Sequence, residues 1–368
     1  MSRQGVHQQD MHKKDMHKKD MEGDMDRRYM REQDGQEMHG PGGKTAGRAL
    51  VLGASGGIGG EVARQLLQAG WEVRALSRNP AVQQGDAAIA WVRGDALVAG
   101  DVLAAAQDCA LVVHAVNPPG YRNWAAQVLP MLRNTIAAAE SVDALVVLPG
   151  TVYNYGTDVF PLAGEEAPQQ PRTRKGILRV RMEEALAAFC RRGGRALVVR
   201  SGDYFGPRAG NSWFGQGLVK PGLPVRRIAN PGRAGVGHQW AYLPDVAAAV
   251  VALVERREGL PAFARFHFGG HWDADGTAMA RAIRHVAEQH GQAAAIGGFP
   301  WWLVRLAAPF NETMRELLEM RYLWREPLRL DNARLVAELG SEPHTPLDIA
   351  VERTLAGLGC VPPAAAST

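Results

Sequence analysis

The sequence lacks the marks of several protein classes. Its three cysteines, Cys109, Cys190 and Cys360, lie far apart and form no Cys-x-x-Cys motif, so we expect reduced thiols in a cytoplasmic protein. There is no run of five or more lysines and arginines, although the net charge is +4; this argues against nucleic acid as a partner. Apolar runs of about 18 residues are also missing, which argues against a membrane partner. We therefore expect a small-molecule substrate, bound by a monomer or a homodimer.

Residues 1–46 differ in composition from the rest of the chain. They contain the pentapeptide DMHKK twice, and they hold seven of the 12 methionines but almost no aliphatic residues. Because such a segment cannot bury a core, we predict that it is a disordered leader. Its histidines and methionines could bind a soft metal, but their spacing fits no closed ligand set, so we predict no metal site.

Three glycines at three-residue steps follow the apolar run 48–52. Gly53 permits a tight turn, Gly56 lets the backbone approach a pyrophosphate, and Gly59 lets the following helix pack close to the strand. Helical spacing over 61–70 and a second apolar run over 71–77 complete a strand–helix–strand unit. The start of such a helix presents free N–H groups to phosphates. We therefore predict a dinucleotide site that also includes Ser55, Gly57 and Ile58.

The end of the second strand indicates which dinucleotide binds. An acidic residue there would bond the ribose 2′-hydroxyl of NAD, but the sequence has Ser77 and Arg78, and Glu72 lies at the opposite end of the strand. Arg78 could pair with a 2′-phosphate. We therefore predict NADP as the cofactor, with NAD as the less favoured alternative.

Further apolar runs predict strands at 87–95, 109–116, 143–150 and 195–202, separated by helical stretches such as 124–140. Alternation of strands and helices is typical of an α/β fold with a Rossmann-type, doubly wound parallel sheet. Its ligand site lies at the carboxyl ends of the strands. There we expect Asp95, Ala115, Thr151 and Ser201 beside the glycine turn.

The domain boundaries follow from composition. We predict an NAD(P)-binding domain over 47–207, to which parts of 240–270 can return. A smaller C-terminal substrate lobe occupies most of 208–360, and 361–368 form a tail. The segment 208–245 is rich in glycine, proline and tryptophan. We expect Trp213, His238 and Trp240 to line a substrate pocket there, or to pack between the lobes. An apolar segment, 297–324, could cap the substrate site or form a partner surface.

The order of motifs resembles the extended short-chain dehydrogenase/reductase superfamily, in its NAD(P)-dependent epimerase/dehydratase group. The matching text includes GASGGIG (53–59), VYNYG (152–156), RSGDYFGPR (200–208) and WAYLPDVAAAV (240–250), within a resemblance over roughly 47–360. The resemblance implies a Ser or Thr after the fifth strand as a catalytic residue. It also implies a Tyr-x-x-x-Lys on the next helix, where the tyrosine exchanges a proton and the lysine holds the cofactor ribose.

The chain departs from this pattern at the catalytic helix, because no tyrosine is followed four residues later by lysine. Family spacing places Lys175 at the tyrosine position and Arg179 at the lysine position. Thr151 matches the Ser or Thr if Tyr155 is the family's Tyr-Gly tyrosine, whereas aligning Tyr153 there would put Pro149 at that position.

Three alternatives follow. Tyr153 or Tyr155 supplies the phenol from another direction; Lys175 donates the proton, with its pKa lowered by Arg179; or no chemistry occurs. The leading hypothesis is an NADP-dependent oxidoreductase or epimerase-like enzyme with altered catalytic residues, acting on a small carbonyl or sugar-type substrate. The alternative is a redox-inactive NADP(H)-binding regulatory or interaction protein.

Overall fold

The computed structural model of the protein describes residues 46–82, 87–118, 124–210 and 212–363. Apart from Ala46, the predicted leader lies outside the described residues, as do 364–368 of the predicted tail. Within the described residues, no helix is both long and apolar enough to cross a membrane.

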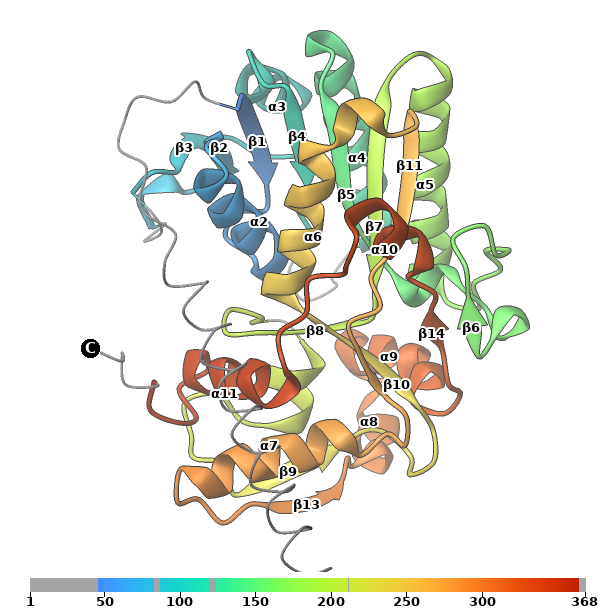
Figure 1. Ribbon diagram of the computed structural model, residues 1–368. Coiled ribbons are helices and arrows are strands. Elements are labelled where there is room, and N and C mark those ends of the chain that lie inside the picture. Colours follow the sequence, from blue (N-terminus) through green and yellow to red (C-terminus); the bar gives the residue numbers. More distant parts are fainter. Residues whose placement is uncertain (1–45, 83–86, 119–123, 211, 364–368) are drawn as a thin grey trace, which may run out of the picture. The chain divides into compact units, whose positions relative to one another are not determined.

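The central sheet contains seven parallel strands in the order β11–β7–β5–β4–β1–β2–β3 (Figure 1). The strands are β1 (Arg48–Leu52), β2 (Glu72–Ser77), β3 (Ala90–Arg93), β4 (Leu111–His114), β5 (Leu145–Thr151), β7 (Arg195–Ser201) and β11 (Phe263–His267). The order changes direction between β1 and β4, which is where open α/β sheets bind their ligands. The Rossmann-type sheet predicted from the sequence is confirmed.

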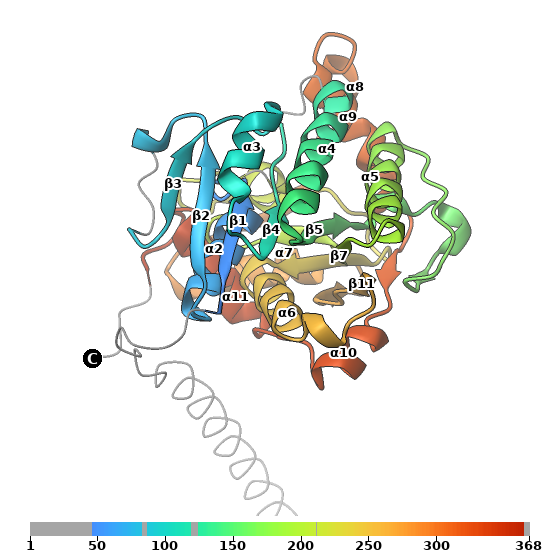
Figure 2. The ribbon, with the colours of Figure 1, turned by 90° about the horizontal axis from the view of Figure 1, so that it is seen from above.

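Helices cover both faces of this sheet, as the view from above shows (Figure 2). One face carries α2 (Gly57–Gln68) and α6 (Leu243–Glu255); the other carries α3 (Ala99–Ala106), α4 (Trp124–Val142) and α5 (Arg174–Arg191). Each face has its own apolar cluster. Burial on both sides explains why the strands are continuous apolar runs rather than alternating ones.

The start of the first helix differs from the sequence prediction in a way that bears on the site. The first helix begins at Gly57 rather than at residue 61, because Gly57 and Gly59 form its first turn and bring that turn close to Gly53. In addition, β11 returns from the C-terminal half to pair with β7.

A smaller lobe lies beyond the carboxyl ends of the strands (Figure 1). Its sheets consist of β8 (Asp203–Phe205), β10 (His238–Tyr242) and β12 (His271–Asp273), and of β9 (Arg227–Asn230) with β13 (Ala295–Gly298). Its helices are α7 (Ala278–Gln289), α8 (Trp301–Ala307), α9 (Glu312–Glu319) and α11 (Leu347–Gly357). Its core is rich in aromatic side chains, among them Phe205, Trp240 and Trp324.

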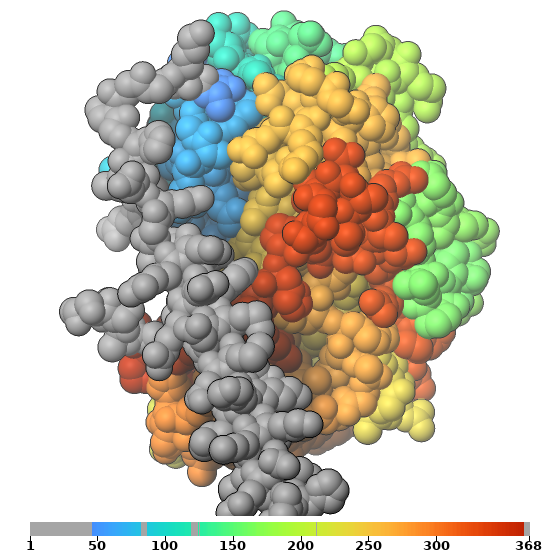
Figure 3. All heavy atoms as spheres, viewed as in Figure 1, coloured from blue at the N-terminus to red at the C-terminus, as the bar shows by residue number. Residues whose placement is uncertain are grey.

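The C-terminal part of the chain also contacts the segment after β5. Strand β14 (Arg329–Leu330) pairs with β6 (Leu162–Ala163), and Arg334 on α10 (Ala333–Leu339) forms an ion pair with Glu166 at 3.1 Å. Figure 3 shows these red and green segments side by side on one face of the molecule. The segment that follows β5 is thereby held by a strand pair and an ion pair from the C-terminal part of the chain.

Candidate active site

A cleft of about 590 Å³ lies at the carboxyl ends of β1, β2, β4 and β5. This volume is within the range of about 300–1,000 Å³ that is usual for small-molecule and cofactor sites. Most of the residues that line it belong to the Rossmann-type domain. The smaller lobe contributes Ala209, Ser212 and Trp213, among others.

The glycine turn forms one wall of the cleft and leaves no room for larger side chains. Gly53 has a φ of +91°, and a Cβ atom there would lie 2.5 Å from the carbonyl oxygen of Ala115. A Cβ atom at Gly59 would lie 2.3 Å from the Gly53 oxygen. The first turn of α2 has neither a side-chain cap nor an acidic residue. The N–H groups of this turn therefore suit a phosphate, so the residues fit a dinucleotide.

The carboxyl end of β2 forms the neighbouring wall. Ser77 and the exposed Arg78 line the cleft, and the hydroxyl of Ser77 accepts a hydrogen bond from the Asn79 N–H at 3.2 Å. No acidic residue lies among the described residues 77–79. Arg78 therefore has the position and the exposure needed to meet a 2′-phosphate.

The ends of β3 and β4 complete the wall. Asp95 lines the cleft, and its carboxylate accepts a hydrogen bond from the Leu97 N–H at 2.9 Å. Ala115 follows His114, whose Nδ1 lies 2.7 Å from the Thr135 hydroxyl. Burial, together with the charge of Arg179, lowers the pKa of His114 to about 3. His114 therefore faces the cleft as a neutral imidazole.

Another part of the cleft begins where β5 ends, with Thr151 and Tyr153 in its lining. The Thr151 hydroxyl accepts a hydrogen bond from the Tyr153 N–H at 3.3 Å and so begins a short helical turn over Val152–Asn154. This turn holds the Tyr153 side chain against the cleft. The phenol of Tyr153 donates to Oδ1 of Asp203 at 3.3 Å.

Asp203 connects this phenol to a buried histidine. Its Oδ2 lies 2.9 Å from Nε2 of His238, and Nδ1 of His238 lies 3.2 Å from the carbonyl oxygen of Leu323. The imidazole also stacks on Trp324, with ring centroids 3.6 Å apart and planes inclined by 8°. His238 is therefore fixed on both edges and on one face, and it fixes Asp203 in turn.

Lys175 lies in the first turn of α5, whose N-terminus is capped by the Thr173 hydroxyl. Its ammonium lies 3.3 Å from Oε2 of Glu316, on α9 of the smaller lobe. Burial lowers the pKa of Lys175, while the charge of Glu316 opposes this shift. An ammonium paired with a carboxylate is poorly suited to act as a base, although Lys175 does line the cleft.

Arg179 lies one helical turn after Lys175 and lines the same cleft. Its guanidinium carbon lies 5.4 Å from the centre of the Trp124 ring, a distance typical of a cation–π contact. The Trp124 indole donates to Asn117 at 2.5 Å, which orients the ring. Arg179 thus contacts Trp124 at the start of α4, and its charge acts on His114 at the end of β4.

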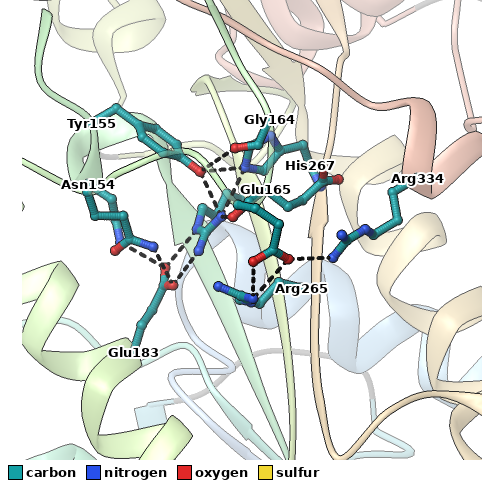
Figure 4. Close-up of polar contacts among 11 residues, drawn as sticks. Asn154, Tyr155, Gly164, Glu165, Glu183, Arg265, His267 and Arg334 are labelled. Carbon is teal, nitrogen blue, oxygen red and sulfur yellow. Dashed lines mark hydrogen bonds and ion pairs between the residues drawn. The ribbon is translucent and has the colours of Figure 1, made fainter. Parts of the chain in front are cut away.

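Tyr155, the other candidate phenol, lies in a buried polar network away from the cleft (Figure 4). Its hydroxyl lies 2.7 Å from Nη1 of Arg200 and 2.7 Å from Nε2 of His267. Burial raises its pKa. Arg200 forms an ion pair with Glu183, which also accepts from Asn154 at 2.8 Å. The structure therefore gives Tyr155 a packing position. Of these two candidate phenols, Tyr153 lines the cleft, as does Tyr204, whose hydroxyl lies 3.1 Å from that of Ser201.

The cleft brings together most of the residues predicted from the sequence. Those that line it are Gly53, Ser55, Gly56, Gly57, Ile58, Ser77, Arg78, Asp95, Ala115, Thr151, Tyr153, Lys175, Arg179 and Trp213. Those that do not line it are Gly59, Tyr155, Ser201, His238 and Trp240. Trp240 packs in the core of the smaller lobe against Phe205 and Trp324. For Trp240, therefore, the structure favours packing over substrate contact.

Three residues of the site were not singled out by the sequence analysis. His114 ends the fourth strand, so a lone histidine at the end of an apolar run was the available signal. Asp203 stands within the RSGDYFGPR segment, directly after the sixth predicted strand. Glu316 comes from α9, and no local pattern connects it with Lys175. The described residues contain no group of three or more His, Cys, Asp or Glu side chains that could hold a metal ion.

Comparisons with known proteins agree with this architecture. A family model described as NAD dependent epimerase/dehydratase family matches residues 49–267. A putative epimerase from Burkholderia cenocepacia J2315 is 22% identical, covers 87% of this chain and 100% of its own, and superposes with a TM-score of 0.66. UDP-glucuronic acid 4-epimerase from Bacillus cereus, in complex with NAD, is 16% identical over 84% of this chain and 96% of its own (TM-score 0.65). A UDP-galactose 4-epimerase is 19% identical over 85% and 98% (TM-score 0.63).

At these identities, the solved structures show a shared fold and nothing finer. Comparison with curated proteins gave no match.

Proposed function

The chain belongs to the NAD dependent epimerase/dehydratase family of extended short-chain dehydrogenases/reductases, and from this membership we propose that it is an NADP-dependent oxidoreductase or epimerase-like enzyme with altered catalytic residues. Its substrate is a small carbonyl or sugar-type compound. The observation that carries the proposal is that the glycine turn, Arg78, Thr151 and Tyr153 all line the same cleft. The smaller lobe supplies the substrate side of this cleft through Trp213.

Each group of residues has a role in this proposal. The glycine turn and the first turn of α2 hold the pyrophosphate, Arg78 meets the 2′-phosphate, and Arg179 holds the nicotinamide ribose. When bound, the nicotinamide supplies or accepts a hydride. Thr151 and Tyr153 hold the reacting oxygen of the substrate.

Tyr153 is the proton donor and acceptor in place of the missing helix tyrosine. In the reducing direction, the carbonyl carbon receives a hydride with its electron pair, and the carbonyl oxygen takes the phenol proton of Tyr153. In the oxidising direction, both transfers reverse, so the hydroxyl proton returns to Tyr153. Without substrate, Asp203 accepts the single phenol proton at 3.3 Å, and His238 keeps Asp203 in place; in the reaction this proton turns from Asp203 to the carbonyl oxygen.

The main alternative is a redox-inactive NADP(H)-binding regulatory or interaction protein. The observation that favours it is the ion pair between Lys175 and Glu316, at the position where the family has its catalytic tyrosine. The two functions are distinguished by whether bound NADPH reduces any member of a panel of carbonyl and sugar substrates. Oxidation of NADPH would support the enzyme, and tight binding without oxidation would support the alternative.

Arg78→Ala is expected to weaken NADP binding about ten- to a hundredfold, because it removes a charge-assisted hydrogen bond to the 2′-phosphate. NAD binding should change little, since NAD lacks that phosphate. Titration of wild type and variant with both nucleotides measures this difference. Arg256→Ala, an exposed arginine outside the cleft, is the matched control. Equal weakening of both nucleotides would refute the preference for NADP.

A further inference from the structure

The charges at the substrate end of the cleft are paired within the protein. We define this end by Thr151, Tyr153, Lys175, Asp203 and Trp213, which line the cleft from the end of β5, the start of α5 and the smaller lobe. Lys175 pairs with Glu316, and Asp203 pairs with His238. Both pairs are buried. A charged substrate would therefore have to break or oppose one of them.

Two carboxylates face the start of α5, not one. Glu316 accepts from the Arg174 guanidinium at 3.0 Å as well as pairing with Lys175, and Glu319 accepts from the Arg174 N–H at 2.6 Å. Two cations and two carboxylates thus balance at this point. An anionic group that approached Lys175 would lie close to the carboxylate of Glu316, and the low exposure of that carboxylate gives the repulsion little screening by water.

Asp203 adds a second negative group. Its carboxylate lines the cleft and is buried, with one oxygen toward Tyr153 and the other toward His238. His238 cannot turn toward the cleft without losing the Leu323 hydrogen bond and the stacking on Trp324. A substrate therefore meets a phenol and a carboxylate at this end, and the one ammonium there, Lys175, is already paired with Glu316.

The arginines that could serve a diphosphate lie elsewhere. Arg208 pairs with Glu61 at 3.2 Å, and Arg226 and Arg227 are exposed outside the cleft. Among the described residues, Lys175 and Arg179 are the cations that line the cleft beyond Arg78. Proteins hold diphosphates with arginine guanidinium groups and N–H donors. A diphosphate that lost its hydration without such partners would be strongly destabilised.

Trp213 gives this end a flat apolar wall. Its ring contacts Phe299, Trp301 and Trp324, with centroids 5.7, 5.8 and 5.2 Å away, so it is held in one orientation. Such a rigid aromatic face suits an apolar or planar group. The wall is continuous with the Trp324 ring that supports His238.

We propose that the substrate is an uncharged carbonyl or alcohol whose apolar part packs on Trp213, and that Glu316 excludes phosphorylated compounds by pairing with Lys175. This inference rests on the proposed function, since it names the substrate class of the same site. Glu316 is a specificity-determining residue here and takes no part in the transfer of hydride or proton.

The test compares two probes, benzaldehyde and UDP, by ligand-observed saturation-transfer NMR on the protein saturated with NADP⁺. Bound NADP⁺ keeps UDP out of the dinucleotide site and lets the aldehyde bind without reduction. Wild type should give saturation transfer to benzaldehyde and none to UDP. Glu316→Gln removes the carboxylate that pairs with Lys175 and should raise UDP affinity about tenfold, enough for its signals to appear. Glu312→Gln, an exposed carboxylate on the same helix, should behave as wild type.

Clear UDP signals with wild type would overturn the inference, and so would a folded Glu316→Gln variant that still rejects UDP. Thermal melting establishes that each variant is folded. If Glu316→Gln does not fold, the inference is tested by the wild-type protein alone, through the comparison of benzaldehyde and UDP signals. Failure of the proposed function is seen separately, because the protein would then not bind NADP⁺ at the start of the experiment or would not transfer a hydride from NADPH.

Discussion

Tyr153→Phe is expected to lower the turnover number for NADPH-dependent reduction by about a hundred- to ten-thousandfold, the usual effect of losing a positioned acid or base. The variant keeps the ring and removes only the hydroxyl that bonds to Asp203. NADPH affinity should stay the same, since the phenol lies away from the glycine turn. Single-turnover absorbance of the reduced nicotinamide measures the rate, and nucleotide titration measures the affinity.

Two further variants make this prediction specific. Tyr322→Phe removes a phenol that lies outside the cleft and donates to a backbone oxygen at 3.4 Å, so turnover should remain near wild type. Lys175→Ala tests the competing donor. If Lys175→Ala were inactive while Tyr153→Phe retained full turnover, the proton would come from Lys175 and the role proposed for Tyr153 would be wrong.

Glu183→Ala is expected to destabilise the protein by about 3–5 kcal/mol, the usual cost of breaking a buried ion pair from one side. Glu183 accepts from Arg200 at 2.9 and 2.6 Å, and the Arg200 side chain is fully buried. Removing the carboxylate would leave a buried cation beside Tyr155 and His267 (Figure 4). Urea-induced unfolding gives the free energy of unfolding.

Glu140→Ala is the matched control, because Glu140 also pairs with an arginine, Arg192, but the pair is exposed. Exposed pairs contribute about 0–1 kcal/mol, so this variant should unfold close to wild type. The double variant Glu183→Leu/Arg200→Met removes both charges and should recover part of the loss. A loss below about 1 kcal/mol in Glu183→Ala would show that the network does not hold the sheet and the β6 loop together.

The cofactor half of the site could be predicted because its signals are local. The glycine spacing, the apolar strand and the helix that follows lie within about 20 residues and dictate one another's geometry. The position of Arg78 could be predicted from the same strand–helix–strand unit, because in such a unit the end of the second strand lies beside the glycine turn. This explains why the residues predicted for the cofactor line the cleft, except Ser201 and Gly59; Gly59 packs the helix against the strand.

The catalytic half could be predicted only in part, because its contacts join distant segments. Tyr153 and Tyr155 are two residues apart, and sequence spacing alone could not show which phenol faces the cleft. Which of the two lines the cleft depends on Arg200 and His267, because the Tyr155 hydroxyl bonds to both of them in the buried network. Lys175 likewise meets Glu316 more than a hundred residues further along the chain.

The most direct test of the proposed function is transfer of deuterium from NADPH labelled at C4 of the nicotinamide. Wild-type protein is mixed in single turnover with a panel of uncharged carbonyl compounds, and mass spectrometry detects the label in the alcohol. We expect deuterium in at least one product with wild type and its loss with Tyr153→Phe. Tight binding of NADPH with no deuterium in any product would contradict the proposal and support a redox-inactive NADP(H)-binding protein.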